Sequence, residues 1–245
     1  MATHVELPVL SFMGIGAQKA GTTWLYENLA RHPRIGFPGG KEVHYWNARR
    51  ATLPEQWYGE LFATGDGRIN GDITPAYATL EPAVVARIGA LFPDLRILFL
   101  LRNPIERAWS AALMAMNRAE LELDEVSDQW FLDHFHSRGS LLRGDYARTL
   151  EIWNQVFAPE QVLVLFFEEL CDAPTALLAR VAAFLEIPPA PEWTRTEVTT
   201  PVFSGRGAPL RPVLRAALVD LYRPRIAALE ARLSLDLGHW CRDSG

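Results

Sequence analysis

The sequence is poor in cysteine and in long apolar runs, and both shortages narrow the class of protein. Only two cysteines, Cys171 and Cys241, occur in 245 residues, and their wide separation gives neither a disulfide framework nor metal-ligand spacing. No segment approaches the roughly 18 uncharged apolar residues of a membrane span. Residues 1–8 lack the basic start and apolar core of a signal peptide. We therefore expect a reduced, cytoplasmic protein with no membrane partner.

Basic charge is also scarce. The chain has 24 basic and 29 acidic residues, a net charge of −5, whereas nucleic-acid-binding domains are usually basic, so we expect no nucleic-acid partner. Hydrophobic residues make up 49% and charged residues 22%, a composition typical of globular proteins. One hydrophobic core can serve a chain of this length, and we expect a single domain over residues 1–245.

Short apolar runs alternate with segments of helical periodicity. Strands are expected where apolar residues run together between turns: residues 9–15, 68–74, 96–101 and 161–167. Helices are expected where apolar residues recur every three or four positions: residues 22–32, 82–92, 104–118, 146–157, 174–185 and 212–233, the last interrupted near Pro224. Residues 121–139 are expected to be helical and residues 194–211 to form a loop. The alternation predicts an α/β fold of three α/β/α layers around a central parallel sheet, with ligands beyond the carboxyl ends of the strands.

A glycine-bearing turn, from Gly16 to Thr23, follows the first expected strand and opens the first expected helix. Backbone N–H groups at a helix N-terminus are unsatisfied and carry partial positive charge, so they suit a phosphate. Lys19 adds a full charge, and the hydroxyls of Thr22 and Thr23 add donors. The turn is therefore a candidate phosphate-binding loop. The alternative is an ordinary strand-to-helix turn with a solvated lysine.

The loop differs from that of a nucleotide triphosphatase in the place of its lysine. Gly16 and Gly21 have the G-x-x-x-x-G spacing and Thr23 takes the Ser/Thr position, but Thr22 stands where the triphosphatase has lysine. That lysine serves the β- and γ-phosphates of a triphosphate bound with Mg²⁺. A lysine inside the loop, at Lys19, indicates a different phosphate and no metal requirement.

A second anion site is expected after the strand at residues 96–101. Arg102 stands at its carboxyl end, and Ser110 follows about two turns along a helix that begins near Pro104. An arginine can grip a phosphate with two parallel hydrogen bonds, and a serine adds one donor. Together with the first loop, this pair predicts a ligand with two separated phosphates.

Both segments resemble donor-binding motifs of the sulfotransferases that use 3′-phosphoadenosine 5′-phosphosulfate (PAPS). Residues 18–24 resemble the 5′-phosphosulfate loop, and residues 102–110 resemble the 3′-phosphate motif. The resemblance implies that these residues bind the donor: Lys19, Ala20, Gly21, Thr22, Thr23, Trp24, Arg102 and Ser110. It also implies a P-loop-NTPase-like fold, release of the desulfated product PAP, no metal, and a leaving phosphate stabilised by Lys19. The resemblance covers residues 10–240.

Two further segments resemble the glycosaminoglycan branch of that family. Residues 41–46, KEVHYW, resemble its K-E-x-H-[FY]-[FW] segment. Residues 72–77, DITPAY, resemble its S-P-A-Y segment, with Thr74 in place of serine. The resemblance implies that Glu42 is the base that deprotonates the acceptor hydroxyl, with His44 as its partner or its rival.

Acceptor contacts are expected from the same two segments. Lys41 is a candidate acceptor-binding residue. Asp72, Thr74 and Tyr77 either line the acceptor pocket or form a turn around Pro75. The resemblance implies an acceptor hydroxyl or amine on a small molecule, a natural product or a saccharide.

A late glycine loop resembles the basic K-G-R loop of the family only approximately. Arg206 and Gly207 match its first two positions, but Ala208 stands where arginine is usual. The resemblance implies that Arg206 and Gly207 close over the adenosine and its 3′-phosphate. Arg195 and Arg211 are available to supply the missing charge.

Two other functions fit part of the pattern. A P-loop small-molecule kinase needs Mg²⁺ and a lysine after Gly21, where the sequence has Thr22. A non-catalytic nucleotide-binding module keeps a phosphate loop but has no need of Glu42 and His44. The sequence therefore predicts a PAPS-dependent sulfotransferase.

Overall fold

The computed structural model describes residues 10–190 and 208–242. Within these ranges five parallel strands form one sheet in the order β2-β3-β1-β4-β5. The strands are β1 (Leu10–Gly16), β2 (Ile35–Gly36), β3 (Ile69–Ile73), β4 (Arg96–Leu101) and β5 (Val162–Phe166). The parallel sheet predicted from the alternating pattern is confirmed.

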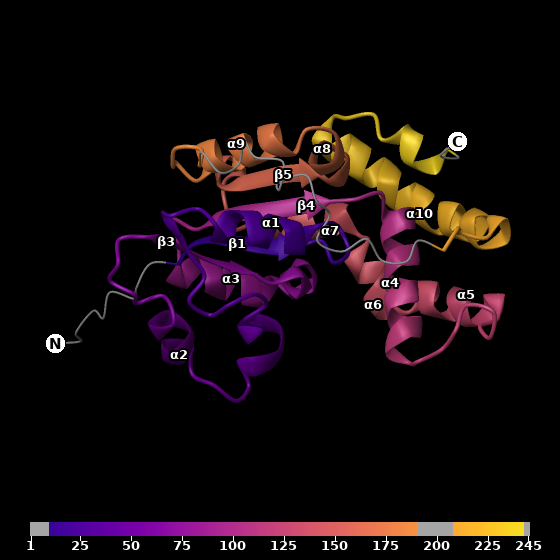
Figure 1. Cartoon of the computed structure of the whole chain (residues 1–245), viewed down its shortest axis with the longest axis horizontal. Helices are drawn as coiled ribbons and strands as arrows, with labels where there is room; N and C mark the ends of the chain where they lie inside the picture. Colours follow the sequence, from indigo (N-terminus) through magenta and orange to yellow (C-terminus); the bar gives the residue numbers. More distant parts are fainter. Residues whose placement is uncertain (1–9, 191–207, 243–245) are drawn as a thin grey trace.

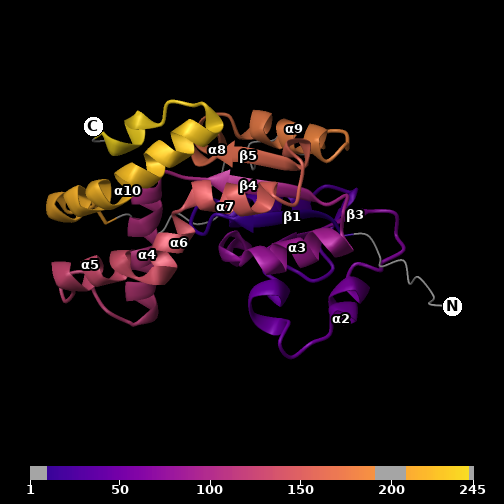
Figure 2. The ribbon, with the colours of Figure 1, turned by 180° about the vertical axis from the view of Figure 1, so that it is seen from behind.

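Helices cover both faces of the sheet. α1 (Thr22–Ala30) crosses in front of it in Figure 1. α3 (Pro82–Leu91) and α7 (Tyr146–Asn154) lie in front of it in Figure 2, which shows the opposite side. α9 (Pro174–Phe184) packs against the edge strand β5. These are the three α/β/α layers that the sequence predicts.

A group of helices stands beyond the carboxyl ends of the strands (Figure 1). It consists of α4 (Pro104–Arg118), α5 (Asp128–His136), α6 (Arg138–Arg143) and α10 (Pro212–Leu233). The short helices α2 (Glu55–Glu60) and α8 (Phe167–Asp172), the π-turn η1 (Tyr45–Arg49) and the 3₁₀ turns η2 (Pro75–Thr79), η3 (Pro159–Gln161) and η6 (Gly238–Cys241) complete the described elements. α4 contacts both α5 and α10, so it links the sheet to this group.

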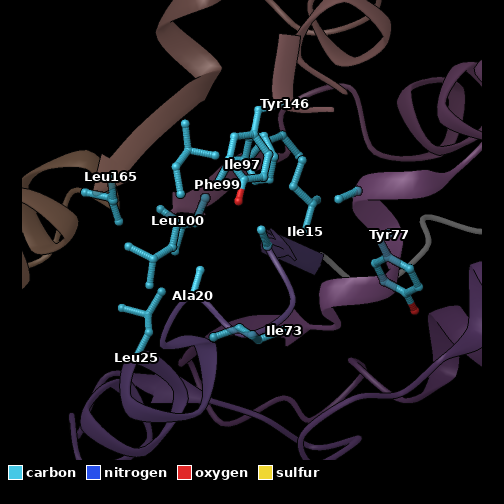
Figure 3. Packing of buried hydrophobic residues seen from close by; sticks show 14 of the residues in the cluster. Ile15, Ala20, Leu25, Ile73, Tyr77, Ile97, Phe99, Leu100, Tyr146 and Leu165 are labelled. Atoms are coloured by element: carbon cyan, nitrogen blue, oxygen red, sulfur yellow. The ribbon is translucent and has the colours of Figure 1, made fainter. Parts of the chain in front are cut away.

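The interior strands form the centre of the core. The side chains of Phe99, Leu100 and Leu101 in β4 are fully buried, because helices cover both faces of that strand. Figure 3 shows this packing, with Ile15 of β1 and Leu25 of α1 in the same cluster. Each large apolar side chain buried in this way stabilises the fold by about 1.5–3 kcal/mol.

The order of the strands places the loop after β1 at a ligand-binding position. From β1 the chain builds β2 and β3 on one side, and it later builds β4 and β5 on the other. A crevice forms at the carboxyl ends of parallel strands where the direction of building reverses. The residues that follow β1 therefore lie at the expected ligand site.

The predicted interruption of the last helix is wrong. α10 runs without a break through Pro224 for 22 residues. Its apolar side, including Leu218, Tyr222 and Ile226, is buried and holds both halves on one axis. Pro224 itself is exposed, so water can satisfy the carbonyl that loses its N–H partner.

Other boundaries also differ from the expected ones. Residues 121–139 do not form one helix, because Ser127 caps the start of α5 and Ser137 caps the start of α6. The two-residue strand β2 and the short helix α8 are too brief to give a periodic signal. Most of the expected loop at residues 194–211 lies outside the described residues.

Candidate active site

The loop after β1 leads into an uncapped helix. Gly21 is the residue before α1 and has a left-handed backbone (φ 94°), which glycine adopts at little cost. Among the described residues no side chain caps the first turn of α1, and that turn contains no acidic residue. The N–H groups of this turn are therefore available to an external anion.

Lys19 is half-buried within this loop. Its backbone carbonyl accepts a hydrogen bond from Nη1 of Arg102, at 3.1 Å. Burial lowers the pKa of the Lys19 ammonium, and the charges of Arg102 and Arg118 lower it further. No carboxylate in the parts of the chain that the structure describes forms an ion pair with Lys19. Cations crowded in this way favour the binding of an anion.

Arg102 is held from several sides at the end of β4. Its guanidinium lies 4.6 Å from the centre of the Phe167 ring and 3.9 Å from the carboxylate of Glu106. Tyr146 donates a hydrogen bond to its carbonyl, at 2.8 Å. Burial lowers the pKa of the guanidinium, which stays charged at neutral pH. Ser110 is half-buried one helical turn beyond Glu106, on the side of α4 nearest Arg102.

Several residues that the sequence predicts to bind the PAPS donor shape the loop after β1. Ala20, Thr22 and Trp24 are buried, whereas Thr23 is partly exposed at the start of α1. A Cβ atom at Gly21 would lie only 2.7 Å from Cδ1 of Leu170. The loop is therefore packed tightly against α8.

Two of the predicted donor residues cannot be placed. Arg206 and Gly207 lie outside the described residues. Their predicted contacts with the adenosine and the 3′-phosphate remain predictions.

A second polar group comes from the segment before η1. The Glu42 carboxylate is 37% exposed and forms an ion pair with Nζ of Lys41. Its other oxygen lies 3.1 Å from Nε2 of His44. Nδ1 of His44 lies 3.2 Å from Oδ1 of Asn47. The structure thus brings Lys41, Glu42 and His44 together in a partly solvent-accessible cluster.

Both candidate bases have left-handed backbones. The φ angle is 62° at Glu42 and 57° at His44, and neither residue is glycine. Such a conformation costs of the order of 1–3 kcal/mol and persists only where surrounding contacts hold it. The Glu42 N–H donates to the carbonyl of Ile73 at 3.1 Å, which fixes the segment against β3.

Asp72 forms a buried hub beneath that segment. Its carboxylate accepts hydrogen bonds from the hydroxyls of Thr74 (2.7 Å), Tyr58 (2.9 Å) and Tyr77 (2.9 Å). Burial raises the pKa of Asp72, and these three donors oppose that rise. The Tyr77 hydroxyl also accepts from the N–H of Tyr45, at 3.0 Å. In Figure 3 this hydroxyl points away from the strand cluster.

This geometry favours one of the two alternatives left open for Asp72, Thr74 and Tyr77. All three are fully buried and contact one another around the turn at Pro75. They support the segment that carries Glu42. Direct contact with an acceptor remains a prediction for them.

Sequence reasoning missed the residues that hold the predicted ones in place. These are Phe167 under Arg102, Tyr146 on its carbonyl, Arg118 near Lys19, and Tyr58 in the hub. Each comes from an element remote in sequence, so no local motif marks it. One signal was available: the chain contains only two lysines, and one lies in each of the two polar groups, Lys19 in the loop after β1 and Lys41 beside Glu42.

Comparisons with known proteins find relatives of this chain. A human heparan sulfate glucosamine 3-O-sulfotransferase 3B1 is 30% identical over 177 residues, which cover 70% of this chain and 44% of the relative. The human bifunctional heparan sulfate N-deacetylase/N-sulfotransferase 2 is 28% identical over 202 residues, covering 76% of this chain and 23% of the relative. The matched regions thus span between about a quarter and a half of these curated relatives.

Solved structures share the fold. A sulfotransferase from Alicyclobacillus acidocaldarius superposes with a TM-score of 0.74 at 28% identity, covering 95% of this chain and 98% of its own. The mouse sulfotransferase SULT7A1 complexed with PAP has a TM-score of 0.58 at 16% identity and covers 92% of this chain and 89% of its own, which supports the fold alone. No helix within residues 10–190 and 208–242 is both long and apolar enough to cross a bilayer.

The family itself follows from one further match. The family model described as "Sulfotransferase domain" matches residues 12–204, most of the chain. That range contains the loop after β1, the cluster at Glu42 and the arginine at the end of β4. The chain therefore belongs to the sulfotransferase domain family.

Proposed function

We propose that this protein transfers a sulfuryl group from PAPS to a hydroxyl or amine of a small-molecule, natural-product or saccharide acceptor and releases PAP. One observation carries the proposal. Lys19 and Arg102 meet at the uncapped N-terminus of α1, joined through the Lys19 carbonyl. Two cations and a row of free N–H groups fit a ligand with more than one anionic group.

The residues present fit such a donor. The Lys19 ammonium and the first turn of α1 would hold the 5′-phosphosulfate end, and Arg102 with Ser110 would hold the 3′-phosphate. The ring of Phe167 already fixes the Arg102 guanidinium. The repulsion that lowers the pKa of Lys19 would be relieved when an anion binds between the cations.

Sulfuryl transfer requires an oriented attack by the acceptor, removal of the acceptor proton and stabilisation of the leaving phosphate. When bound, PAPS supplies a sulfuryl group joined to its 5′-phosphate through a bridging oxygen. The acceptor oxygen forms a new S–O bond while the bond to that bridging oxygen breaks, and the acceptor proton passes to Glu42. Lys19 stabilises the charge that develops on the departing 5′-phosphate of PAP. The mechanism includes no metal.

Glu42 is the first choice for the base. Its carboxylate is partly exposed, and the adjacent His44 ring and Lys41 ammonium fix its direction. A base positioned in this way contributes typically about 10²–10⁴-fold to the rate. His44 is the rival, because its own ring is 38% exposed.

The relatives support the class of acceptor. Their names include heparan sulfate glucosamine sulfotransferases, which act on a saccharide. Another structural neighbour is a sulfotransferase domain from the curacin biosynthetic pathway, matched at the level of the fold. We infer an acceptor within this saccharide or small-molecule range, and a cytoplasmic location remains a prediction.

The kinase alternative is not favoured. Thr22, where a kinase loop has lysine, is buried at the start of α1. Lys19 instead lies beside Arg102. This arrangement leaves no lysine at the position that serves a γ-phosphate.

The central test uses sulfur-labelled PAPS and a panel of hydroxyl and amine acceptors. We expect label transfer to at least one acceptor and binding of PAP by calorimetry. If no acceptor is labelled and PAP does not bind, the proposal fails.

Matched variants assign the roles. Lys19→Ala and Glu42→Gln should each abolish turnover, and Glu42→Gln should keep its affinity for PAP. Glu151→Gln, an exposed site on α7, is the control and should turn over normally. A normal rate in Glu42→Gln would move the base to His44, and His44→Asn would then lose activity.

Arg102 has its own test. Arg102→Ala should weaken PAP binding by about 2 kcal/mol or more, because a charge-assisted contact is lost. The exposed Arg87→Ala on α3 should leave PAP affinity unchanged. Unchanged affinity in Arg102→Ala would remove the 3′-phosphate from this position.

A further inference from the structure

A cavity of about 450 Å³ lies beside the phosphate loop, between α4, α5 and α6. Its wall includes Gln18 of the loop, Arg107 and Arg118 of α4, His134 of α5 and Arg143 of α6. The volume lies within the range of pockets that hold small ligands. The term basic cavity is used below for this space and these five residues.

The charged side chains that line the basic cavity are all of one sign. Among the residues that the structure describes, the cavity lining contains three arginines and His134 but no aspartate or glutamate. The whole chain, in contrast, has more acidic than basic residues. No ion pair joins Arg107, Arg118 or Arg143 to a carboxylate within residues 10–190 and 208–242. A negatively charged ligand would balance this cluster.

Arg107 is the most deeply buried of these cations, with 0% of its surface exposed. Its Nη2 donates to the carbonyl of Ser140 (3.1 Å) and lies 3.2 Å from the hydroxyl of Tyr222. Its Nε and Nη1 have no hydrogen-bond partner among the described residues. One side of the guanidinium thus links α4, α6 and α10, whereas the other side is left unsatisfied, which is costly for a buried charge.

Arg143, like Arg107, has a buried guanidinium nitrogen, Nε, without a hydrogen-bond partner in the described part of the chain. Burial lowers the pKa of Arg143, and the charge of Arg107 lowers it further. The pKa of His134 is lowered by burial and then by these same two arginines. Arg107 and Arg143 thus place two positive charges near each other in the cavity wall, and their charge favours the neutral form of His134.

The basic cavity adjoins the loop that carries Lys19. Gln18 precedes Lys19 in the loop and contributes to the cavity wall. Arg118, from the cavity, is one of the charges that lower the pKa of Lys19. A ligand in the cavity would lie next to the lysine that serves the departing phosphate.

We propose that the basic cavity holds a negatively charged group of the acceptor, a carboxylate, sulfate ester or phosphate ester. Arg118 and Arg143 contact the anion, and Arg107 adds its charge from behind. Ala111 and Met114 of α4 form an apolar wall for the uncharged body of the same molecule. The proposal rests on the proposed function, because it assigns the substrate class of that site.

A purely structural role explains only part of the arrangement. Arg118 lies in the last turn of α4, where a cation favours the helix dipole. Arg107 cross-links three helices through Nη2 alone. Neither role explains why, within residues 10–190 and 208–242, Arg143 has no ion-pair partner and the cavity lining has no carboxylate.

The test measures equilibrium binding to the protein saturated with PAP, so that no turnover is needed. Two probes are compared by calorimetry: 4-nitrophenyl β-glucuronide and 4-nitrophenyl β-glucoside, which differ in one carboxylate. We expect the glucuronide to bind at least tenfold more tightly. Arg118→Gln and Arg143→Gln should each reduce that preference to threefold or less.

Arg138→Gln is the matched control. It lies on α6 like Arg143, but it is exposed and absent from the cavity wall. This variant should keep the full preference for the glucuronide. Arg143→Gln and Arg138→Gln should bind PAP like the wild type, and Arg118→Gln is compared at saturating PAP, which separates this test from a failure of the proposed function.

Three results would overturn the proposal. The first is equal binding, or no binding, of the two probes to the PAP-loaded protein. The second is a glucuronide preference that survives in both Arg118→Gln and Arg143→Gln. The third is inorganic sulfate that binds the cavity as tightly as the glucuronide, because the cavity would then serve a free anion.

Discussion

Lys19 shows how its surroundings adapt a single residue to its role. Its ammonium is half-buried among cations and has no carboxylate partner in the described chain, a condition that an ordinary surface lysine does not meet. The same environment that lowers its pKa makes an incoming phosphate favourable. Anion binding and proton uptake at Lys19 are therefore coupled.

This coupling can be measured directly, because the protein has only two lysines. In protein labelled with ¹⁵N on the lysine side chains, we expect the Lys19 signal to titrate below its ordinary pKa of 10.5. Lys41→Arg assigns the two signals. Since only the ammonium form pairs with phosphate, PAP affinity should begin to fall as the pH rises through this lowered pKa.

Two results would contradict this account of Lys19. One is a Lys19 signal that titrates at 10.5 or above in the free protein. The other is a PAP affinity whose fall with pH is the same in Lys19→Met, because the ionisation would then belong to another group. Added PAP should shift the Lys19 pKa upward.

At the scale of elements, the hub at Asp72 fixes the segment of Glu42 to the sheet. Tyr77→Phe would leave the buried N–H of Tyr45 without its acceptor and remove one donor from Asp72. We expect a loss of about 1–3 kcal/mol in the free energy of unfolding, measured in urea. Turnover should fall while PAP affinity stays unchanged, because Lys19 and Arg102 are untouched.

Tyr26→Phe is the control for that experiment. Tyr26 packs its ring on Phe37, 4.7 Å away, and its hydroxyl is not part of the hub. Its loss of stability should be much smaller. A Tyr77→Phe variant as stable and active as Tyr26→Phe would show that the hub does not position Glu42.

The junction between the loop and α1 is a second test at this scale. Gly21→Ala would force a side chain into a left-handed backbone and bring Cβ within 2.7 Å of Leu170. We expect a loss of stability and weaker PAP binding, because the start of α1 must move. Leu170→Ala in the same chain should recover part of the loss.

Gly40→Ala distinguishes the cost of a left-handed backbone from the cost of the steric contact with Leu170. Gly40 also has a positive φ, 70°, but a Cβ there meets nothing within 4 Å. It should show only the cost of the left-handed backbone, about 1–2 kcal/mol. Equal effects at Gly21 and Gly40 would mean that the contact with Leu170 has no consequence.

The helices and strands also show which features of the fold can be predicted from the sequence. The apolar run at residues 96–101 and the helix at Pro104 were predicted at the bounds that the structure has, because burial on both faces and an N-terminal proline are local signals. The hub at Asp72 and the stacking of Phe167 on Arg102 were not predictable, because tertiary packing joins them. Pro224 was misjudged, since the burial of one helix face outweighed the local cost of proline.

At the scale of the whole molecule, the site joins early and late segments of the described chain. β1 and α1 supply the phosphate loop, and β4 supplies Arg102. The carbonyl of Trp240, near the end of the chain, accepts a hydrogen bond from Asn103, the residue after Arg102. Trp240 also donates to Glu168 of α8, at 3.0 Å. Because early and late segments meet at one place, we propose that the chain folds as a single domain.

Thermal unfolding tests this unity together with the donor site. By calorimetry we expect one transition with equal calorimetric and van't Hoff enthalpies. PAP at 100 times its dissociation constant should add about 2.7 kcal/mol, which corresponds to a rise in Tm of roughly 5–10 °C for a chain of this size. Lys19→Ala should unfold near the wild-type temperature without PAP and show a smaller rise at the same PAP concentration. Two separate transitions, only one of which moves with PAP, would instead divide the chain into independent units and confine the donor site to one of them.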